Sequence, residues 1–192
     1  MSRSRVIGVG LAAVLAVMLI GCQQQQVDMA KMMKPPPRPA ELDHLEMLIG
    51  TWEGTAEMKV AGSDEVATGE GVETYSWDAD KWVLVNHFEY KTGDENEMRG
   101  LAIWTWDAKA KKYRTWSFDN SGYCESGSAT YDQENKTWHF KGKSGNTVTG
   151  KKSVGKGSSQ MVDDDTQEWN YTIWDGWKLR KLMEFKGTTH RK

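Results

Sequence analysis

The sequence predicts an all-β domain, a single antiparallel up-and-down β-barrel of about ten strands with a short N-terminal helix that closes one end. Two observations support this fold class. From residue 51 onward, short runs of aromatic and β-branched residues alternate with turn-forming residues, and no further long helical period occurs. The turns also alternate in chemistry along the chain, as expected when successive turns lie at opposite ends of a meander.

The expected helix covers residues 41–49, because Leu42, Leu45 and Leu48 recur there at helical spacing with acidic residues between them. We assign residues 41–187 to one barrel domain, which is long enough to bury a core of its own. The predicted strands are 51–60, 66–77, 82–91, 97–106, 112–118, 123–131, 136–142, 146–154, 166–174 and 177–186.

Alternation along the strands predicts which side chains face the interior. The first strand has an apolar face that contains Trp52 and Met58 and a charged opposite face. The same alternation places Tyr171, Met183 and Phe185 on inner faces of the last two strands. Met58, Tyr171, Met183 and Phe185 are therefore candidate ligand contacts. The last strand is also expected to turn Trp177 and Leu179 inward.

Lys181 departs from the apolar pattern of the last predicted strand. It shares its parity with Met183, so it should point into the barrel, where a buried ammonium group needs a partner. Lys181 is thus a candidate anchor for an anionic group of a ligand. Two alternatives remain open: an ion pair with an inward glutamate, or a β-bulge that turns the side chain out to solvent.

The turns predict which end of the barrel is which. Glycine-type turns follow every odd-numbered strand and contain Gly62, Gly93, Gly122, Gly145 and Gly176. Most even-numbered turns begin with an aromatic residue and Asp, namely Trp77-Asp78, Trp106-Asp107 and Tyr131-Asp132. Because the N-terminal helix enters at the aromatic end, that end is the expected floor and the glycine end the expected mouth. Residues 150–157 are interpreted as a basic, flexible connector.

The N-terminus has the pattern of a signal peptide over residues 1–21: two arginines and then 15 uncharged, largely apolar residues. This run is shorter than the ~20 residues of a transmembrane helix, which is the alternative. Leu19-Ile20-Gly21-Cys22 resembles a bacterial lipobox, which implies lipidation of Cys22. Residues 22–40 are polar and proline-rich and are expected to form a disordered tether. Gln23 after the cysteine favours the outer over the inner membrane.

Composition excludes several kinds of partner and site. The formal net charge is −2 and no basic stripe stands out, which argues against nucleic acid. The four histidines do not fall at metal-ligand spacing, so no metal site is expected. Cys124 is expected to be a buried small hydrophobe, with a reactive thiol as the alternative. No motif for nucleophilic catalysis occurs, which favours a non-enzymatic protein over an enzyme.

The opening Gly50-Thr51-Trp52 after a short helix resembles the calycin superfamily of lipocalins, fatty-acid-binding proteins and nitrobindins. The resemblance implies that Trp52 closes the barrel floor. Lys181 resembles, by position, the cationic groups with which fatty-acid-binding proteins hold a carboxylate. Nitrobindins bind haem through a histidine near the C-terminus, and His190 is the one candidate here. The alternative is that residues 188–192 are a frayed tail and that no cofactor binds.

A narrower resemblance covers residues 41–186. The chain is similar to the bacterial group called domain of unknown function 1579, a lipocalin-like set without an assigned activity. The residues that carry the similarity are Leu45-x-x-Leu48-x-Gly50-x-Trp52-Glu53-Gly54, the hairpin from Trp106-Asp107 to Tyr113, Asp164-Asp165-Thr166, and Asp175-Gly176 with Lys181 and Glu184. This resemblance implies a fold but no substrate.

Three functions are consistent with these predictions. The first is a lipid-anchored protein of the cell envelope whose barrel binds a small apolar or amphipathic ligand that enters from the glycine end. The second is a structural or interaction lipoprotein with a filled barrel. The third is a haem-binding enzyme that depends on His190. The size of the internal cavity distinguishes the first from the second.

Overall fold

The structure is a computed structural model that describes residues 34–93, 96–177 and 180–192. The predicted signal peptide, Cys22 and most of the predicted tether lie outside the described residues. The chain divides into two units, Met1–Pro37 and Arg38–Lys192. Of the first unit, residues 34–37 are described, and they contain no helix or strand. Among the described residues, no helix combines the length and the apolar character needed to cross a membrane.

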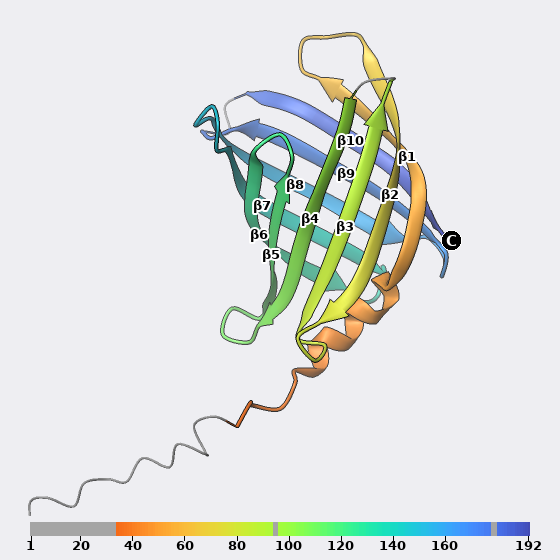
Figure 1. Ribbon diagram of the computed structural model, residues 1–192, viewed down its shortest axis with the longest axis vertical. Helices are drawn as coiled ribbons and strands as arrows, with labels where there is room; N and C mark the ends of the chain where they lie inside the picture. Colours follow the sequence, from red (N-terminus) through yellow and green to blue (C-terminus); the bar gives the residue numbers. More distant parts are fainter. Residues whose placement is uncertain (1–33, 94–95, 178–179) are drawn as a thin grey trace, which may run out of the picture. The chain divides into compact units, whose positions relative to one another are not determined.

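The second unit is a closed antiparallel barrel of ten strands in meander order, with β1 paired to both β2 and β10 (Figure 1). This confirms the predicted fold class. The elements are η1 (Ala40–Leu48), β1 (Gly50–Val60), β2 (Val66–Asp78), β3 (Val83–Thr92), β4 (Asn96–Asp107), β5 (Lys112–Asp119), β6 (Tyr123–Asp132), β7 (Thr137–Asn146), β8 (Lys152–Met161), β9 (Thr166–Asp175) and β10 (Lys181–Arg191).

The two ends of the barrel differ as the turn chemistry predicts. The connections after β1, β3, β5, β7 and β9 share one end, the mouth, and Gly62, Gly93 and Gly122 adopt positive φ there. The connections after the even strands lie at the other end, where η1 packs (Figure 1). One detail differs: Gly145 lies within β7, and the connection that follows turns at Gly150 instead.

The floor is built by η1 and the first residues of β1. Leu42, Leu45 and Leu48 are fully or almost fully buried, and their spacing of three residues suits the 3₁₀ geometry that η1 adopts. Trp52 is 1 % exposed and its indole Nε1 donates a hydrogen bond of 2.8 Å to the carbonyl of Leu48. The helix and this tryptophan thus cover the end of the barrel together.

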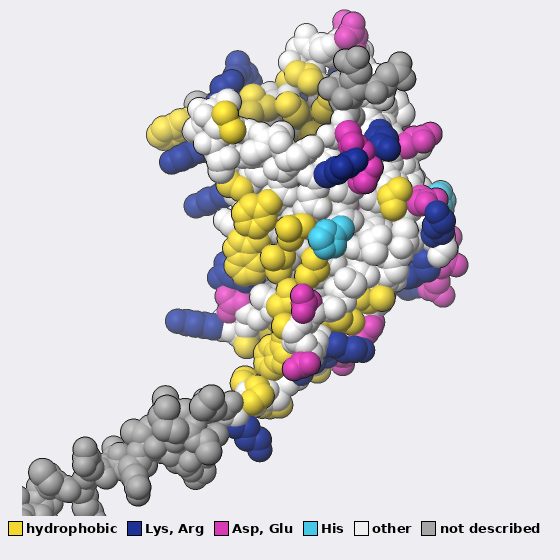
Figure 2. All heavy atoms as spheres, in the orientation of Figure 1, with side chains coloured by type: hydrophobic (Ala, Val, Ile, Leu, Met, Phe, Trp, Pro, Cys, Tyr) yellow, Lys and Arg dark blue, Asp and Glu magenta, His cyan; other side chains and the backbone are white. Residues whose placement is uncertain are grey.

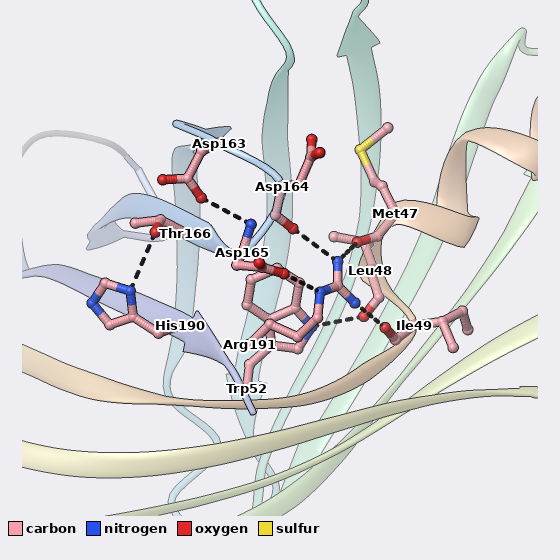
Figure 3. Close-up of polar contacts among 10 residues, drawn as sticks. All are labelled: Met47, Leu48, Ile49, Trp52, Asp163, Asp164, Asp165, Thr166, His190 and Arg191. Carbon is pink, nitrogen blue, oxygen red and sulfur yellow. Dashed lines mark hydrogen bonds and ion pairs between the residues drawn. The ribbon is translucent and has the colours of Figure 1, made fainter.

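Arg191, at the end of β10, connects the floor to the C-terminal end of η1 (Figure 3). Its guanidinium carbon lies 4.3 Å from the centroid of the Trp52 ring. It donates to the carbonyls of Ile49 and Met47, the latter at 2.9 Å, and to groups in the connection before β9. Gly50 has a φ of 121°, and a Cβ built there would lie 3.3 Å from the guanidinium, so a glycine suits this close approach.

Two predicted boundaries at the C-terminal half are wrong. Residues 150–157 are not a connector and the eighth strand does not cover 146–154, because β7 continues to Asn146 and β8 runs from Lys152 to Met161, where its glycines pack under the Tyr171 ring. Residues 188–192 are not a frayed tail, because β10 continues to Arg191, where β-branched threonines and pairing with β1 extend the strand.

The start of the last strand is also misplaced by the prediction. β10 begins at Lys181, and Trp177 lies in the preceding connection with 85 % of its surface exposed instead of facing the interior. Leu179 lies outside the described residues. The flanking Asp175-Gly176 turn removes Trp177 from the β-ladder, so strand alternation does not apply to it.

Candidate functional site

The interior holds a polar cluster around the carboxylate of Glu73. Alternation along β2 turns Glu73 and Tyr75 to the inner face, and β3 brings Asn86 and Tyr90 alongside. Glu73 accepts hydrogen bonds from Tyr75 Oη at 2.5 Å, from Asn86 Nδ2 at 3.2 Å and from Tyr90 Oη. Burial, followed by the charge of Glu73, raises the pKa of both tyrosines well above the ordinary value. The two phenols therefore remain donors to this carboxylate at neutral pH.

A second carboxylate, Glu125 on β6, faces the interior nearer the mouth. It accepts from Tyr171 Oη at 2.7 Å and from Tyr123 Oη at 3.0 Å. Burial raises the pKa of Glu125, although the two phenol hydrogen bonds act in the opposite direction. A Cβ at Gly142 would lie 2.3 Å from the Glu125 carboxyl carbon, and one at Gly155 would lie 2.1 Å from Tyr171 Oη. These glycines provide the space that the cluster occupies.

Between the Glu73 cluster and the floor lies a cavity of about 110 Å³. Its walls combine aromatic rings with a few polar groups. Trp104 packs edge-on against Trp138 and Phe140 with ring centroids 5.6 Å apart, which builds one side. The lining residues are Leu48, Glu73, Tyr75, Trp104, Trp138, Phe140, Ser159, Gln167 and Trp169.

Three polar groups of this lining are buried without a hydrogen-bond partner among the described residues: Trp138 Nε1, Trp169 Nε1 and Ser159 Oγ. Two of them are donors only, and the hydroxyl can also donate. Unpaired buried donors are rare, because leaving one unsatisfied costs about 1–3 kcal/mol. The cavity is thus chemically suited to hold a molecule that offers acceptor oxygens.

The structure separates the predicted ligand contacts from this cavity. Tyr171 faces inward but belongs to the Glu125 cluster. Met58 and Phe185 are directly paired between β1 and β10, and Met183 is paired with Ile173. None of the four predicted contacts is among the lining residues of the 110 Å³ cavity.

The expectation that Lys181 points into the barrel is wrong. A register shift between Lys181 and Met183 pairs Lys181 with the outward Trp174, so strand alternation is interrupted. The Lys181 ammonium forms a 2.7 Å ion pair with Glu184 on the outer face. Of the two alternatives, the β-bulge that turns Lys181 out to solvent is the one observed.

His190 and Cys124 also lie on the outer surface. His190 is exposed, is paired with Glu53 of β1, and places its Nδ1 3.3 Å from Thr166 Oγ1 (Figure 3). It therefore does not reach the interior, where the haem ligand of the resemblance would have to lie. Cys124 is half-buried beside Phe118 instead of fully buried, because β6 alternation assigns the inner face to Glu125.

The sequence prediction did not identify Glu73 or Glu125, although a signal was present. Glu73 shares its parity with Tyr75 and Trp77, and Glu125 shares its parity with Tyr123. A carboxylate on an otherwise aromatic face predicts a buried, hydrogen-bonded group.

Comparison with solved structures agrees with the fold. The chain is similar to the crystal structure of Rv2717c from M. tuberculosis, with 14 % identity, a TM-score of 0.64, and coverage of 81 % of this chain and 99 % of that one. It is also similar to the S-type phycobiliprotein lyase CPES from Guillardia theta, with 10 % identity, a TM-score of 0.57, and coverage of 81 % and 94 %. No family model and no curated protein matches the chain, so membership of the domain of unknown function 1579 group stays a prediction. At these identities the similarity shows a shared β-barrel fold and no more.

Proposed function

We propose that this protein is a small-molecule-binding barrel that holds a small uncharged group with an acceptor oxygen in its floor cavity. The observation that carries the proposal is the set of three unpaired polar groups on the cavity wall. A carbonyl, ether or hydroxyl oxygen would satisfy them, while the surrounding rings would cover the apolar remainder of the ligand. The ligand would enter from the glycine-turned mouth, because η1 covers the other end.

Charge and size restrict the ligand further. Glu73 forms part of the wall, and its carboxylate would repel an anionic group. With Lys181 on the outer face, no lysine or arginine is among the residues that line the cavity. A volume of about 110 Å³ is below the ~150 Å³ of an engineered cavity that binds benzene. The cavity therefore suits a neutral group of a few heavy atoms, either a whole ligand or one end of a longer molecule.

A matched pair of probes tests this site. Acetone and 2-methylpropene have the same shape and four heavy atoms each, but only acetone offers an acceptor. Titration of the full-length protein, followed by the NMR signals of the tryptophan indole N–H groups, should show tighter binding of acetone by about tenfold, the value of one net hydrogen bond of ~1.4 kcal/mol. Equal affinity for the two probes would contradict the donor-lined site.

Two serines on β8 provide the variant and its control. Ser159→Ala removes a cavity donor and should reduce the preference for acetone. Ser158→Ala changes the neighbouring, outward serine, which accepts a 2.8 Å hydrogen bond from Asn170, and should leave the preference unchanged. Native mass spectrometry of protein purified from its own host would identify a retained ligand directly.

A structural or interaction protein with a filled barrel is the second candidate. The small cavity favours it, because pockets for drug-sized ligands have about 300–1,000 Å³. This function predicts that no molecule is retained and that neither probe binds.

We also propose that the barrel is tethered to the bacterial cell envelope through lipidated Cys22, with the outer membrane as the favoured location. The proposal is supported by the lipobox-like Leu19-Ile20-Gly21-Cys22 and by the polar, proline-rich segment that follows. Whole-protein mass spectrometry should find an acylated Cys22 at the N-terminus, and Cys22→Ser should release the protein from the membrane fraction. An unmodified, uncleaved N-terminus would contradict the anchor.

A further inference from the structure

The outer surface of β5–β9 has a groove of about 590 Å³. Most of the residues that line it alternate with the inward residues of the same strands, so they belong to the outer surface. The lining residues are Arg114, Trp116, Ser126, Gly127, Ser128, Lys141, Gly142, Lys143, Val154, Gly155, Lys156 and Trp174.

The registers of the five strands explain the groove. Gly127, Gly142 and Gly155 are directly paired across β6, β7 and β8 and form its bed. Two rows of side chains flank them across the strands. One row is Trp116, Ser126, Lys143, Val154 and Trp174, and the other is Arg114, Ser128, Lys141 and Lys156. At ~4.8 Å between strands, the groove spans about 19 Å from β5 to β9.

The groove is basic. Lys141 and Lys156 are directly opposite each other on neighbouring strands, an arrangement that destabilises a sheet unless an anion compensates it. Together with Lys143 they are exposed, and none of the three forms an ion pair with any residue in the described part of the chain. Arg114 is paired with Asp107 at 2.9 Å, but no carboxylate lies among the lining residues.

A tryptophan ring lies at each end of the groove. Trp116 of β5 is 38 % exposed, and Trp174 of β9 occupies the corresponding position at the opposite end of the same row. Figure 2 shows the neighbouring face, formed by β2–β5, where hydrophobic side chains gather on the side toward β5 and Lys and Arg side chains project beyond them. Ser126 of β6 lies between Trp116 and Lys143 in this row, and Ser128 lies between Arg114 and Lys141 in the other.

We propose that this groove binds an anionic polysaccharide chain laid across the strands. Acidic groups of the sugar units would neutralise Lys141, Lys143 and Lys156, and sugar faces would stack on Trp116 and Trp174. The serine hydroxyls would form hydrogen bonds with sugar hydroxyl groups. The site lies on the opposite side of the sheet from the interior cavity, so it does not depend on the function proposed for that cavity.

The geometry favours this partner over other anions. A bilayer presents a flat surface, which does not fill a groove of about 590 Å³. A peptide cannot extend the sheet, because the closed barrel has no free edge. Single-stranded nucleic acid binds through a strongly basic groove and through aromatic rings that stack on successive bases. This chain has a net charge of −2, and the two tryptophans of the groove are about 19 Å apart, too far to stack on successive bases.

The test uses the purified full-length protein and oligogalacturonate, with dextran oligomers of equal length as the neutral comparison. Oligogalacturonate should bind, and binding should weaken with added salt. The double variant Lys141→Gln with Lys156→Gln should weaken binding at least tenfold. The control, Lys59→Gln with Lys186→Gln, removes the same charge from the outer faces of β1 and β10 and should leave the affinity within about twofold, since long-range contributions are screened.

A second measurement does not require a variant. Bound oligogalacturonate should protect Lys141 and Lys156, but not Lys59, from acetylation by acetic anhydride, read by peptide mass spectrometry. Equal binding of dextran, equal loss in the two double variants, or tighter binding of oligothymidylate or of anionic phospholipid vesicles would each overturn the proposal.

Discussion

At the scale of single residues, the polar side chains at the floor and in the interior connect parts of the chain that are distant in sequence. Arg191 donates to carbonyl groups at the end of η1 and in the connection before β9, and covers the Trp52 ring. Glu125 is held by two phenols in a region that excludes most solvent. Both residues can be tested by changing one side chain.

Arg191→Met should destabilise the barrel by about 2 kcal/mol, because it leaves carbonyls near the floor without donors while it keeps most of the packing volume. Urea unfolding measures this change. Lys192→Met is the matched control, since it removes only the exposed ion pair with Glu53 and should cost less than about 0.5 kcal/mol. Equal effects of the two substitutions would show that Arg191 does not hold the floor.

Glu125 predicts a specific pH dependence. Its pKa is raised above 4.5 in the folded protein by burial, so between that value and the folded pKa the folded state binds more protons than the unfolded state. The contribution of Glu125 to stability is therefore fully present below pH 4.5 and is lost as the pH rises through the folded pKa.

Glu125→Gln removes this titration, so the wild-type protein should lose stability relative to the variant as the pH rises from 4 to 8. Urea unfolding at several pH values gives the difference between the two proteins. Other carboxylates with lowered pKa values, such as Asp107 and Asp132, affect both proteins alike and cancel in that difference. A difference that is constant across this range would contradict the burial of a charged Glu125.

At the scale of elements, the inward-facing glycines of the strands leave room for aromatic rings from the neighbouring strands. Gly71 lies under Tyr90, Gly157 under Tyr171, and Gly187 under Trp169, each in direct cross-strand register. A ring can fold over the backbone there because no side chain stands in its place. The glycine content of β8 therefore reflects packing rather than flexibility.

Gly155→Ala should destabilise the protein by about 1–3 kcal/mol, because its Cβ would force the Tyr171 ring away from Glu125. Thermal unfolding detects this loss, and the absorbance of the displaced tyrosine provides a second signal. Gly145→Ala on β7 is the control, since its Cβ would meet only ordinary contacts at 3.4 Å. A similar stability for both variants would contradict the role assigned to Gly155.

At the scale of the whole molecule, closure of the sheet joins β1 to β10 and leaves the two ends chemically different. One end is covered by η1 and the Arg191 contacts, while the other carries the glycine turns. Three strands, β7, β8 and β9, contribute residues to the interior cavity and, on their opposite side, to the outer groove. A barrel can have both sites because alternate residues of each strand face opposite ways.

The unit boundary at Arg38 predicts where the chain can be shortened. A protein that begins at Arg38 should unfold within about 1 °C of the full-length chain, because the floor contacts of η1 are kept. A protein that begins at Gly50 loses the three buried leucines of η1 and should unfold well below it, since each buried leucine contributes about 2–5 kcal/mol. Calorimetry measures both transitions. Equal transitions would show that the helix does not support the barrel.

The sequence by itself determined the fold class, the number of strands, the helix at the floor and the assignment of turns to the two ends. These features depend on local patterns: period-two alternation, leucine spacing and turn residues. A bulge or a strand boundary interrupts that pattern, which is why alternation does not predict the orientation of Lys181, His190 and Trp177.

Only the tertiary structure decided the candidate sites. The unpaired donors Trp138, Ser159 and Trp169 come from β7, β8 and β9 and meet in one cavity because the sheet closes. The facing pair Lys141 and Lys156 depends on the register between two strands. Registers and cavities arise from packing between distant segments, and no local pattern in the chain specifies them.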